Sequence, residues 1–222
     1  MLSRPFRIAA RLLLVPLCAA ALGQGVREAA GGTTVAKAAE PAADGAHASA
    51  RVQTDEPADS NPLTGTYREL ESKDEEIGRK VLAETAHLER DEREKFAREF
   101  HRVLSAEPLF AIEQYETTVT INYPTGRRVP FEADGKVRRF RVKGAGLLEL
   151  RASLEGRRLV VDFAWPEGDR LRLTYEKSAD GRLLTFTRSA ASRAVPLPVT
   201  VSSRYEVLSP KATRTFAGLL PR

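Results

Sequence analysis

The second half of the chain alternates apolar and polar residues with a period of two. Similar alternating runs recur roughly every 10–12 residues as far as residue 207. Groups typical of tight turns separate the runs, namely Pro124-Thr125-Gly126, Asp134-Gly135, Glu155-Gly156 and Asp180-Gly181. This spacing predicts about nine or ten strands in an antiparallel up-and-down meander, with Asp134-Gly135 as a strong hairpin signal. Because a flat sheet would leave two exposed edges, we expect the meander to curl into a barrel or half-barrel.

The register of two predicted hairpins follows from matching apolar partners on one face. Pairing Leu154 with Leu159 across Glu155-Gly156 places Arg151 opposite Asp162 on the outer face. For the next hairpin, the expected partners are Trp165 with Leu171, Phe163 with Leu173 and Val161 with Tyr175.

The pattern before the meander predicts one strand and two helices. A short alternating stretch at 62–70 predicts a first strand. From 72 to 106 apolar residues recur at helical spacing; Ser72 or Asp74 is suited to cap the first helix, and Pro108 ends the run. The apolar stripe consists of Ile77, Val81, Leu88, Phe96, Phe100 and Leu104. Because the opposite face is charged, we expect an amphipathic helical hairpin whose stripe packs over an open end or side of the barrel.

The first 61 residues have the composition of targeting and linker segments. Residues 1–24 begin with three arginines and no acidic residue, continue through an apolar stretch at 12–22, and include small residues near their end. This pattern is typical of a cleaved secretory signal peptide; an uncleaved membrane anchor is the alternative, although the stretch is short for a span of about 30 Å. Residues 25–61, rich in Ala, Gly, Thr, Asp and Pro, predict a flexible linker. Cleavage would remove Cys18, the only cysteine, and we expect a periplasmic or secreted mature protein.

Composition narrows the class of protein further. The chain has 222 residues, of which 42% are hydrophobic, and its body has no apolar run long enough for a membrane helix. One Cys and three His exclude a disulfide scaffold and disfavour a zinc site, and we expect His87 and His101 to be ordinary, partly exposed residues. The chain contains no recognisable nucleotide-binding, hydrolase, kinase or metalloprotease motif. We therefore predict no enzyme activity, no cofactor and no metal.

The arrangement resembles a known family. A signal peptide and linker, a short first strand, a helical insertion and a meander with glycine turns are similar to lipocalin-like (calycin-like) small β-barrel domains of bacterial exported proteins. The resemblance covers about residues 62–208, within a predicted domain of 62–222. The phrases that carry it are Leu63-Thr64-Gly65-Thr66-Tyr67, Thr118-Val119-Thr120-Ile121, Arg158-Leu159-Val160-Val161, Leu173-Thr174-Tyr175-Glu176 and Asp180-Gly181-Arg182-Leu183-Leu184. The resemblance implies an up-and-down barrel, mainly β, and a binding role for an apolar ligand.

Aromatic side chains gather on the predicted inner face of the meander. The candidate ligand-binding residues are Tyr123, Phe131, Phe140, Phe163, Trp165, Tyr175 and Tyr205. They predict either a lumen that holds an apolar ligand, with tyrosine hydroxyls to orient it, or a barrel filled by its own side chains. Both alternatives stay open from the sequence.

Basic residues gather on the predicted outer face. Residues 107–222 hold twenty Lys or Arg against thirteen Asp or Glu. The expected outward set is Arg138 or Arg139, Arg141, Lys143, Arg151, Arg158, Arg170, Arg172 and Arg188. This face is either a surface for an anionic envelope component or an acidic protein, or a solvated face whose charges prevent edge pairing. We expect Glu149, Asp162 and Glu176 to form cross-strand ion pairs there rather than a catalytic pair.

Two functions from different classes fit this sequence. The first is an exported, non-enzymatic binding module that takes a lipid or another hydrophobic or amphiphilic small molecule into the barrel. The alternative is a cell-envelope interaction or structural protein that uses its helical hairpin and basic face on a protein or an anionic surface. Nucleic acid is not expected as a partner, because the aromatic and basic residues occupy opposite faces instead of interleaving.

Overall fold

The computed structural model of the chain describes residues 61–142 and 146–219. The predicted signal peptide, almost all of the predicted linker, Cys18 and Lys143 lie outside these residues. The elements are β1 (Gly65–Glu69), α3 (Asp74–Glu84), α4 (Arg90–Leu104), β2 (Leu109–Tyr115), β3 (Thr118–Asn122), β4 (Arg128–Glu132), β5 (Asp134–Val142), β6 (Gly146–Glu155), β7 (Arg158–Ala164), β8 (Arg170–Lys177), β9 (Leu183–Ala191) and β10 (Val199–Ser209).

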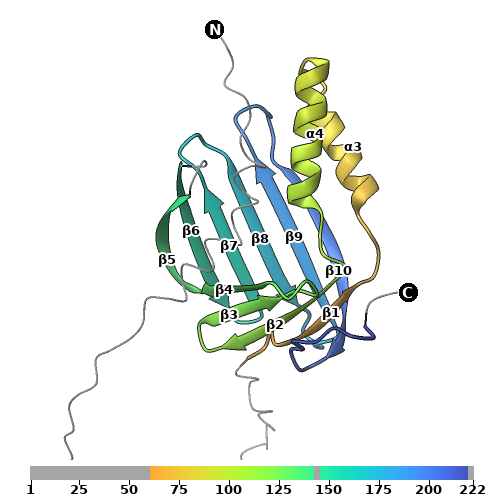
Figure 1. Ribbon diagram of the computed structural model, residues 1–222, viewed down its shortest axis with the longest axis vertical. Helices are drawn as coiled ribbons and strands as arrows, with labels where there is room; N and C mark the ends of the chain where they lie inside the picture. The colour runs from red at the N-terminus through yellow and green to blue at the C-terminus, as the bar shows by residue number, and fades with distance from the viewer. Residues whose placement is uncertain (1–60, 143–145, 220–222) are drawn as a thin grey trace, which may run out of the picture.

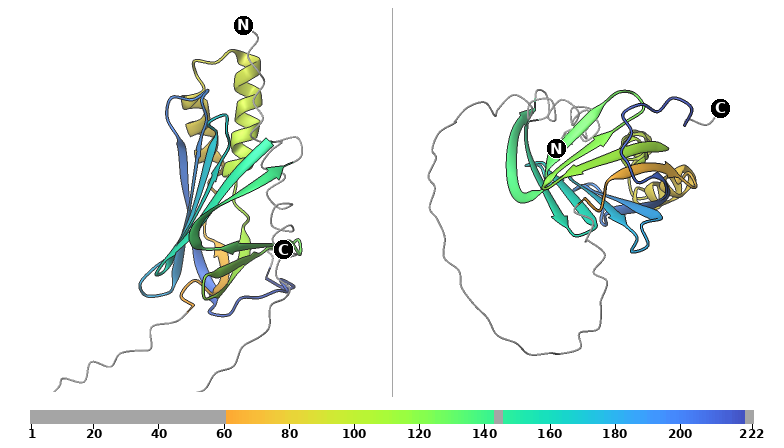
Figure 2. Two further views of the ribbon diagram at one scale, coloured as in Figure 1. Left: turned by 90° about the vertical axis from the view of Figure 1, so that its left-hand side faces the viewer. Right: turned by 90° about the horizontal axis from the view of Figure 1, so that it is seen from below.

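The strands form a single antiparallel sheet that curls into a nearly closed barrel (Figures 1 and 2). Within the described residues the sheet has ten strands in the order β4-β3-β2-β1-β10-β9-β8-β7-β6-β5. Every hydrogen-bonded pair is antiparallel, and β1 pairs with both β2 and β10, so it joins the two halves of the sheet. The mainly-β, up-and-down barrel with two helices after its first strand is confirmed.

The chain does not form a hairpin at Asp134-Gly135, contrary to the sequence prediction. β4 and β5 are the two edges of the sheet and do not pair with each other, although a single residue separates them. Gly135 takes a left-handed φ of 75°, and the pairing of β5 with β6 is irregular from Asp134 to Val137. The backbone N–H of Leu154 in β6 donates to the carbonyl of Ala133 (3.2 Å). Asp134-Gly135 therefore forms a bulged corner that carries the chain from one edge of the sheet to the other.

An ion pair at this corner predicts an acid-dependent loss of stability. The Arg138 guanidinium donates to the Asp134 carboxylate (2.8 Å) and, with the backbone N–H of Lys136, holds the pKa of Asp134 well below its usual range. A lowered pKa in the folded state stabilises the fold above the unfolded-state pKa of about 4, and that contribution is lost as the pH falls below it. We expect Asp134→Asn to be less stable than the wild type near neutral pH, with a gap that narrows as the pH is lowered. Urea unfolding at several acidic pH values measures the gap, and a pH-independent gap would contradict the assignment.

The predicted register is right for one hairpin and wrong for the next. Leu154 pairs with Leu159 and Arg151 with Asp162, as expected. In the following hairpin Leu171 lies opposite Phe163 and not opposite Trp165. The other two expected pairs, Phe163 with Leu173 and Val161 with Tyr175, are shifted in the same way. The observed pairs are Val161 with Leu173 and Leu159 with Tyr175. The reason is that the backbone N–H of Trp165 donates to the carbonyl of Asp169 (3.0 Å), so Trp165 closes the loop. Because the shift is two residues, the side chains keep their predicted faces.

The two helices pack on the sheet through their predicted stripe. α3 contacts β10 and α4 contacts β9, above β1 to β4 in the view of Figure 1. Ile77, Val81, Phe96, Phe100 and Leu104 are all buried in the main core, and Leu88 in the loop between the helices is half-buried. The rings of Phe96 and Phe100 stack with their centroids 4.1 Å apart. The helical hairpin thus covers part of the barrel with its apolar stripe, as expected.

The sequence pattern does not reveal β2, because both faces of this strand are buried. Phe110 and Ile112 face the barrel core, while Leu109 and Ala111 lie in a second cluster with Phe216. This second cluster forms where the segment after β10 folds back over the outside of the sheet. A strand covered on both sides has no apolar-polar alternation, so periodicity alone does not reveal it.

Candidate ligand-binding site

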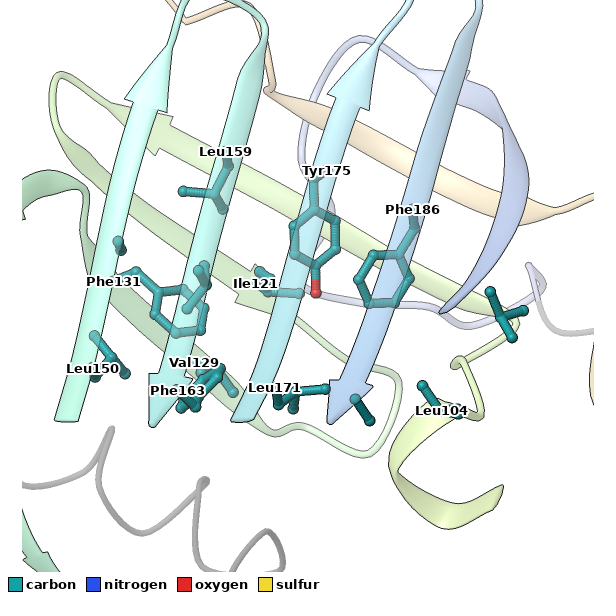
Figure 3. Close-up of a cluster of buried hydrophobic side chains, with 14 of the residues drawn as sticks. Leu104, Ile121, Val129, Phe131, Leu150, Leu159, Phe163, Leu171, Tyr175 and Phe186 are labelled. Atoms are coloured by element: carbon teal, nitrogen blue, oxygen red, sulfur yellow. The ribbon is translucent and has the colours of Figure 1, made fainter. Parts of the chain in front are cut away.

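A cavity of about 440 Å³ lies inside the barrel, so side chains do not fill the lumen completely. Its walls come from β2 to β4 on one side and from β7 to β9 on the other, and the end of α4 with the segment after it closes it further. Figure 3 shows the two strand layers crossing, with their aromatic and aliphatic side chains directed into the space between them. The apolar lining includes Phe110, Val129, Phe131, Phe163, Leu171 and Phe186.

The cavity brings together four of the seven residues predicted to bind a ligand. Tyr123, Phe131, Phe163 and Tyr175 line it, whereas Phe140, Trp165 and Tyr205 do not. Trp165 is buried behind Phe163, with ring centroids 6.4 Å apart, and Phe140 packs half-buried against the core from β5. Tyr205 is fully buried, and its hydroxyl donates to the carbonyl of Glu107 (2.9 Å). These three support the lining or the segment after α4 instead of facing the cavity.

An aromatic cluster forms one wall of the cavity. Phe110 lies at its centre, with ring centroids 4.8 Å from Tyr205, 5.9 Å from Tyr175 and 6.3 Å from Phe186. Tyr175 and Phe186 stack nearly parallel at 4.2 Å on neighbouring strands (Figure 3). Such offset and edge-to-face pairs fix ring orientations beyond simple burial. The aromatic set was anticipated, but Phe110 and Phe186 were missing from the predicted site.

Two tyrosine hydroxyls supply polar atoms to this apolar wall. Tyr123 and Tyr175 line the same cavity, the first half-buried and the second buried. Burial raises the pKa of both phenols, that of Tyr175 strongly, so both stay neutral across the physiological range. Neutral hydroxyls can donate and accept hydrogen bonds but do not exchange protons near neutral pH.

Charged side chains lie near the end of α4 and the β3-β4 turn. The Arg127 guanidinium lies over the Tyr123 ring, 4.1 Å from its centroid, and faces the Glu107 carboxylate at 3.9 Å. Arg102 from the last turn of α4 also lines the cavity. Arg102 and Arg127 are exposed, whereas the aromatic wall is buried. Arg102 and Arg127 therefore add positive charge where the cavity approaches solvent.

Arg188 lies inside the barrel, which corrects its assignment to the outer face. It is only 1% exposed, and it follows Leu184 and Phe186 on the inward side of β9. Its Nη2 donates to the Ser203 hydroxyl (2.6 Å), and its guanidinium lies 5.0 Å from the centroid of the Phe186 ring. Its Nε and Nη1 are buried without a hydrogen-bond partner. Burial lowers the pKa of Arg188, but an arginine remains charged in proteins.

The other arginines of the predicted outer face are exposed or half-buried. Arg139 pairs with Glu149 (2.8 Å) and Arg172 with Asp162 (2.6 Å) across neighbouring strands, as expected of cross-strand ion pairs. Asp162 thus takes its ion-pair partner from β8, although Arg151 is its register neighbour in β6. These pairs belong to the surface of the sheet and not to the cavity.

No group of three or more His, Cys, Asp or Glu side chains able to hold a metal ion occurs within 61–142 and 146–219. In the same part of the chain, no helix has the length and hydropathy needed to cross a bilayer.

Comparison with known proteins gives structural likenesses only. No protein-family model matches the chain, and no curated protein matches it in sequence. Among solved structures, a luciferase domain from the dinoflagellate Lingulodinium polyedrum superposes with a TM-score of 0.44 and 13% identity over 68% of this chain; the chain spans 43% of that domain. Zebrafish ileal bile acid-binding protein complexed with cholic acid superposes with a TM-score of 0.39 and 18% sequence identity, over 66% of this chain and 99% of its own length. Lipid binding protein 8 of Caenorhabditis elegans superposes with a TM-score of 0.41 and 12% sequence identity, over 66% of this chain and 95% of its own length.

Proposed function

We propose that this protein binds a hydrophobic or amphiphilic small molecule in the cavity of its barrel. The observation that carries the proposal is the cavity itself, about 440 Å³ in volume and lined mainly by aromatic and aliphatic side chains. Small-molecule sites commonly occupy some 300–1,000 Å³, with apolar walls and a few polar groups that fix orientation. Burying apolar ligand surface contributes about 25 cal/mol per Å², and the Tyr123 and Tyr175 hydroxyls give such a ligand a polar contact.

The groups that line the cavity favour binding over catalysis. Acid-base catalysis needs a side chain that changes its protonation state near the working pH. Burial raises the pKa of Tyr123 and Tyr175, and the arginines at the cavity stay protonated. The one lining serine, Ser105, lies 3.1 Å from Nδ1 of His101, but its hydroxyl donates to the His101 carbonyl (2.7 Å), the local bond of a serine at a helix C-terminus. We therefore infer a carrier or sensor of a small molecule.

Filling the cavity tests this function. Leu173 projects into the lumen from β8 and lines the cavity, so Leu173→Trp places a larger ring in the empty space. We expect the wild type to bind the neutral dye phenylnaphthylamine at one site per chain, and the variant to bind it roughly tenfold or more weakly. Fluorescence titration measures both affinities.

A matched substitution on the surface serves as the control. Leu82→Trp makes the same exchange on α3, where Leu82 is 55% exposed, and we expect its dye affinity to stay within about twofold of the wild type. Equal affinities for all three proteins would show that the dye binds outside the cavity and would contradict the proposed function.

The fold gives less support to the alternative function, a protein that acts by binding another protein or an anionic surface. Five of the six stripe residues of the helical hairpin are buried against the chain's own core, so they are unavailable to a partner. The exposed arginines of β5 to β8 remain a predicted surface for an anionic or acidic partner, although two of them already pair with carboxylates.

We also propose that the protein is exported and acts in the periplasm or outside the cell. The support is the arginine-rich start, the apolar stretch at 12–22 and the small residues Ala19, Ala21 and Gly23. We expect the mature chain to begin between Leu22 and Gly25. Intact-mass analysis of the protein from its native host checks this, and a cytoplasmic protein that retains Met1 would contradict it.

A further inference from the structure

We propose that the ligand carries a single anionic head group bound by Arg188, and that Glu69 restricts this head group to one negative charge. The inference rests on the function proposed above and specifies the chemical class of the ligand. It combines the place of Arg188 between two cavities, its unpaired donors, and the Glu69 carboxylate that shares the second cavity with it.

Arg188 lies between an apolar cavity and a polar one. It lines both the main cavity of about 440 Å³ and a second cavity of about 180 Å³ near the start of α3. The main cavity is largely apolar, whereas the second is lined by charged and polar side chains that include Glu69, Ser72, Lys73 and Asp74. A molecule with an apolar body in the main cavity would thus meet a cation at the end nearer the second cavity.

The hydrogen bonding of Arg188 is incomplete without a ligand. Its Nη2 donates to the Ser203 hydroxyl, but its buried Nε and Nη1 have no acceptor. Within 61–142 and 146–219, no carboxylate forms a salt bridge with this guanidinium. Leaving buried donors unpaired is costly, and an oxyanion with two neighbouring oxygens matches one edge of a guanidinium by accepting two parallel N–H bonds. Nη1 and the second N–H of Nη2 form such an edge, so a carboxylate or sulfonate head group would supply the acceptor that Nη1 lacks.

Glu69 places a negative charge beside Arg188. Both side chains line the second cavity, so their opposite charges face the same space. Glu69 is half-buried on β1 and lines the second cavity. One negative charge on the ligand is attracted by Arg188, but a second would be repelled by Glu69 where little water screens it. The arrangement therefore favours monoanions over dianions.

Two dyes that share a ring system separate the head group from the apolar body. Anilinonaphthalene sulfonate and phenylnaphthylamine differ in the sulfonate group. For Arg188→Met we expect the sulfonate dye to bind roughly tenfold to a hundredfold more weakly, the loss of a charge-assisted hydrogen-bond pair. The neutral dye should keep its affinity within about twofold. Arg188→Lys, which keeps the charge but not the planar fork, should give an intermediate loss.

Arg204→Met is the matched control, because Arg204 is exposed and points outward from the adjacent strand β10. It should change neither affinity by more than about twofold. A sulfonate dye that binds Arg188→Met as well as the wild type would overturn the inference, as would an equal loss of both dyes. If the wild type binds neither dye, the proposed function itself fails, a result distinct from either of these.

Chain-length-matched competitors test the role of Glu69. At about pH 8 dodecanoate is a monoanion, whereas dodecyl phosphate is largely a dianion. We expect dodecanoate to displace the neutral dye at lower concentration than dodecyl phosphate, and Glu69→Gln to raise the affinity for the phosphate roughly fivefold. Glu206→Gln, on the outer face and paired with Arg68, is the control. A phosphate that competes as well as dodecanoate, with no response to Glu69→Gln, would refute the single-charge restriction.

Discussion

Phe100→Asp is expected to lower the free energy of unfolding by at least about 4 kcal/mol. Phe100 is fully buried between α4 and the sheet and stacks on Phe96 at 4.1 Å. Removing a buried phenyl ring costs about 3–5 kcal/mol, and burying a carboxylate without a partner adds to this. Because Arg102 and Val103 of the same helix line the cavity, loosening α4 also opens one of its walls. Urea unfolding measures the stability, and stopped-flow fluorescence measures the rate of dye entry.

The matched variant Phe100→Leu keeps an apolar side chain, so we expect it to cost less than about 2 kcal/mol and to leave dye entry close to the wild-type rate. If Phe100→Asp changed neither the stability nor the entry rate, α4 would not pack on the barrel. If it lowered the stability and left entry unchanged, α4 would support the fold without gating the cavity.

Arg188→Met is expected to raise the stability of the ligand-free protein by about 1–3 kcal/mol. The gain arises because the substitution removes a buried charge and two unpaired donors, while a methionine side chain retains apolar packing in place of the arginine stem. Thermal and urea unfolding of the delipidated protein measure the difference.

The sign of that change is informative. A stabilising Arg188→Met substitution that also weakens anion binding identifies a side chain kept for function at the expense of stability. A loss of several kcal/mol would instead mean that the guanidinium holds the barrel together. Arg204→Met again provides the comparison, with an expected change within about 0.5 kcal/mol.

Strand alternation made most of the barrel predictable from sequence. The register of the β6-β7 hairpin followed from pairing Leu154 with Leu159, because a wrong register would have turned apolar side chains outward. The same logic failed by two residues in the β7-β8 hairpin, where a shift of two preserves every face and periodicity cannot detect it. The apolar stripe of the helices was likewise predictable from the sequence, since only one face of each helix is apolar.

The parts that escaped prediction depend on contacts distant in sequence. Asp134-Gly135 has the composition of a hairpin turn, but β4 and β5 lie at opposite edges of the sheet, and only the complete strand order reveals this. Phe110 lies in a strand buried on both faces, because Phe216 covers the outer side from the far end of the chain.

The site was predictable in its aromatic part and not in its charged part. The inward phase of β9 runs through Leu184 and Phe186 to Arg188, so strict alternation does place the arginine inside. An arginine among arginines of a basic sheet is nevertheless expected at the surface, since buried unpaired charges are rare. The cavity volume itself depends on how the two strand layers cross, which no periodicity encodes.

The most direct test of ligand binding uses the only tryptophan of the chain. Trp165 lies behind Phe163, and Phe163 lines the cavity. A terminally brominated dodecanol is neutral and quenches tryptophan over short distances without direct contact, so from beside Phe163 it reports on the apolar cavity independently of Arg188. If the cavity binds apolar molecules, quenching of Trp165 saturates at one molecule per chain and is reversed by unbrominated dodecanol. Linear quenching with no saturation and no reversal, as for free tryptophan in solution, would contradict it.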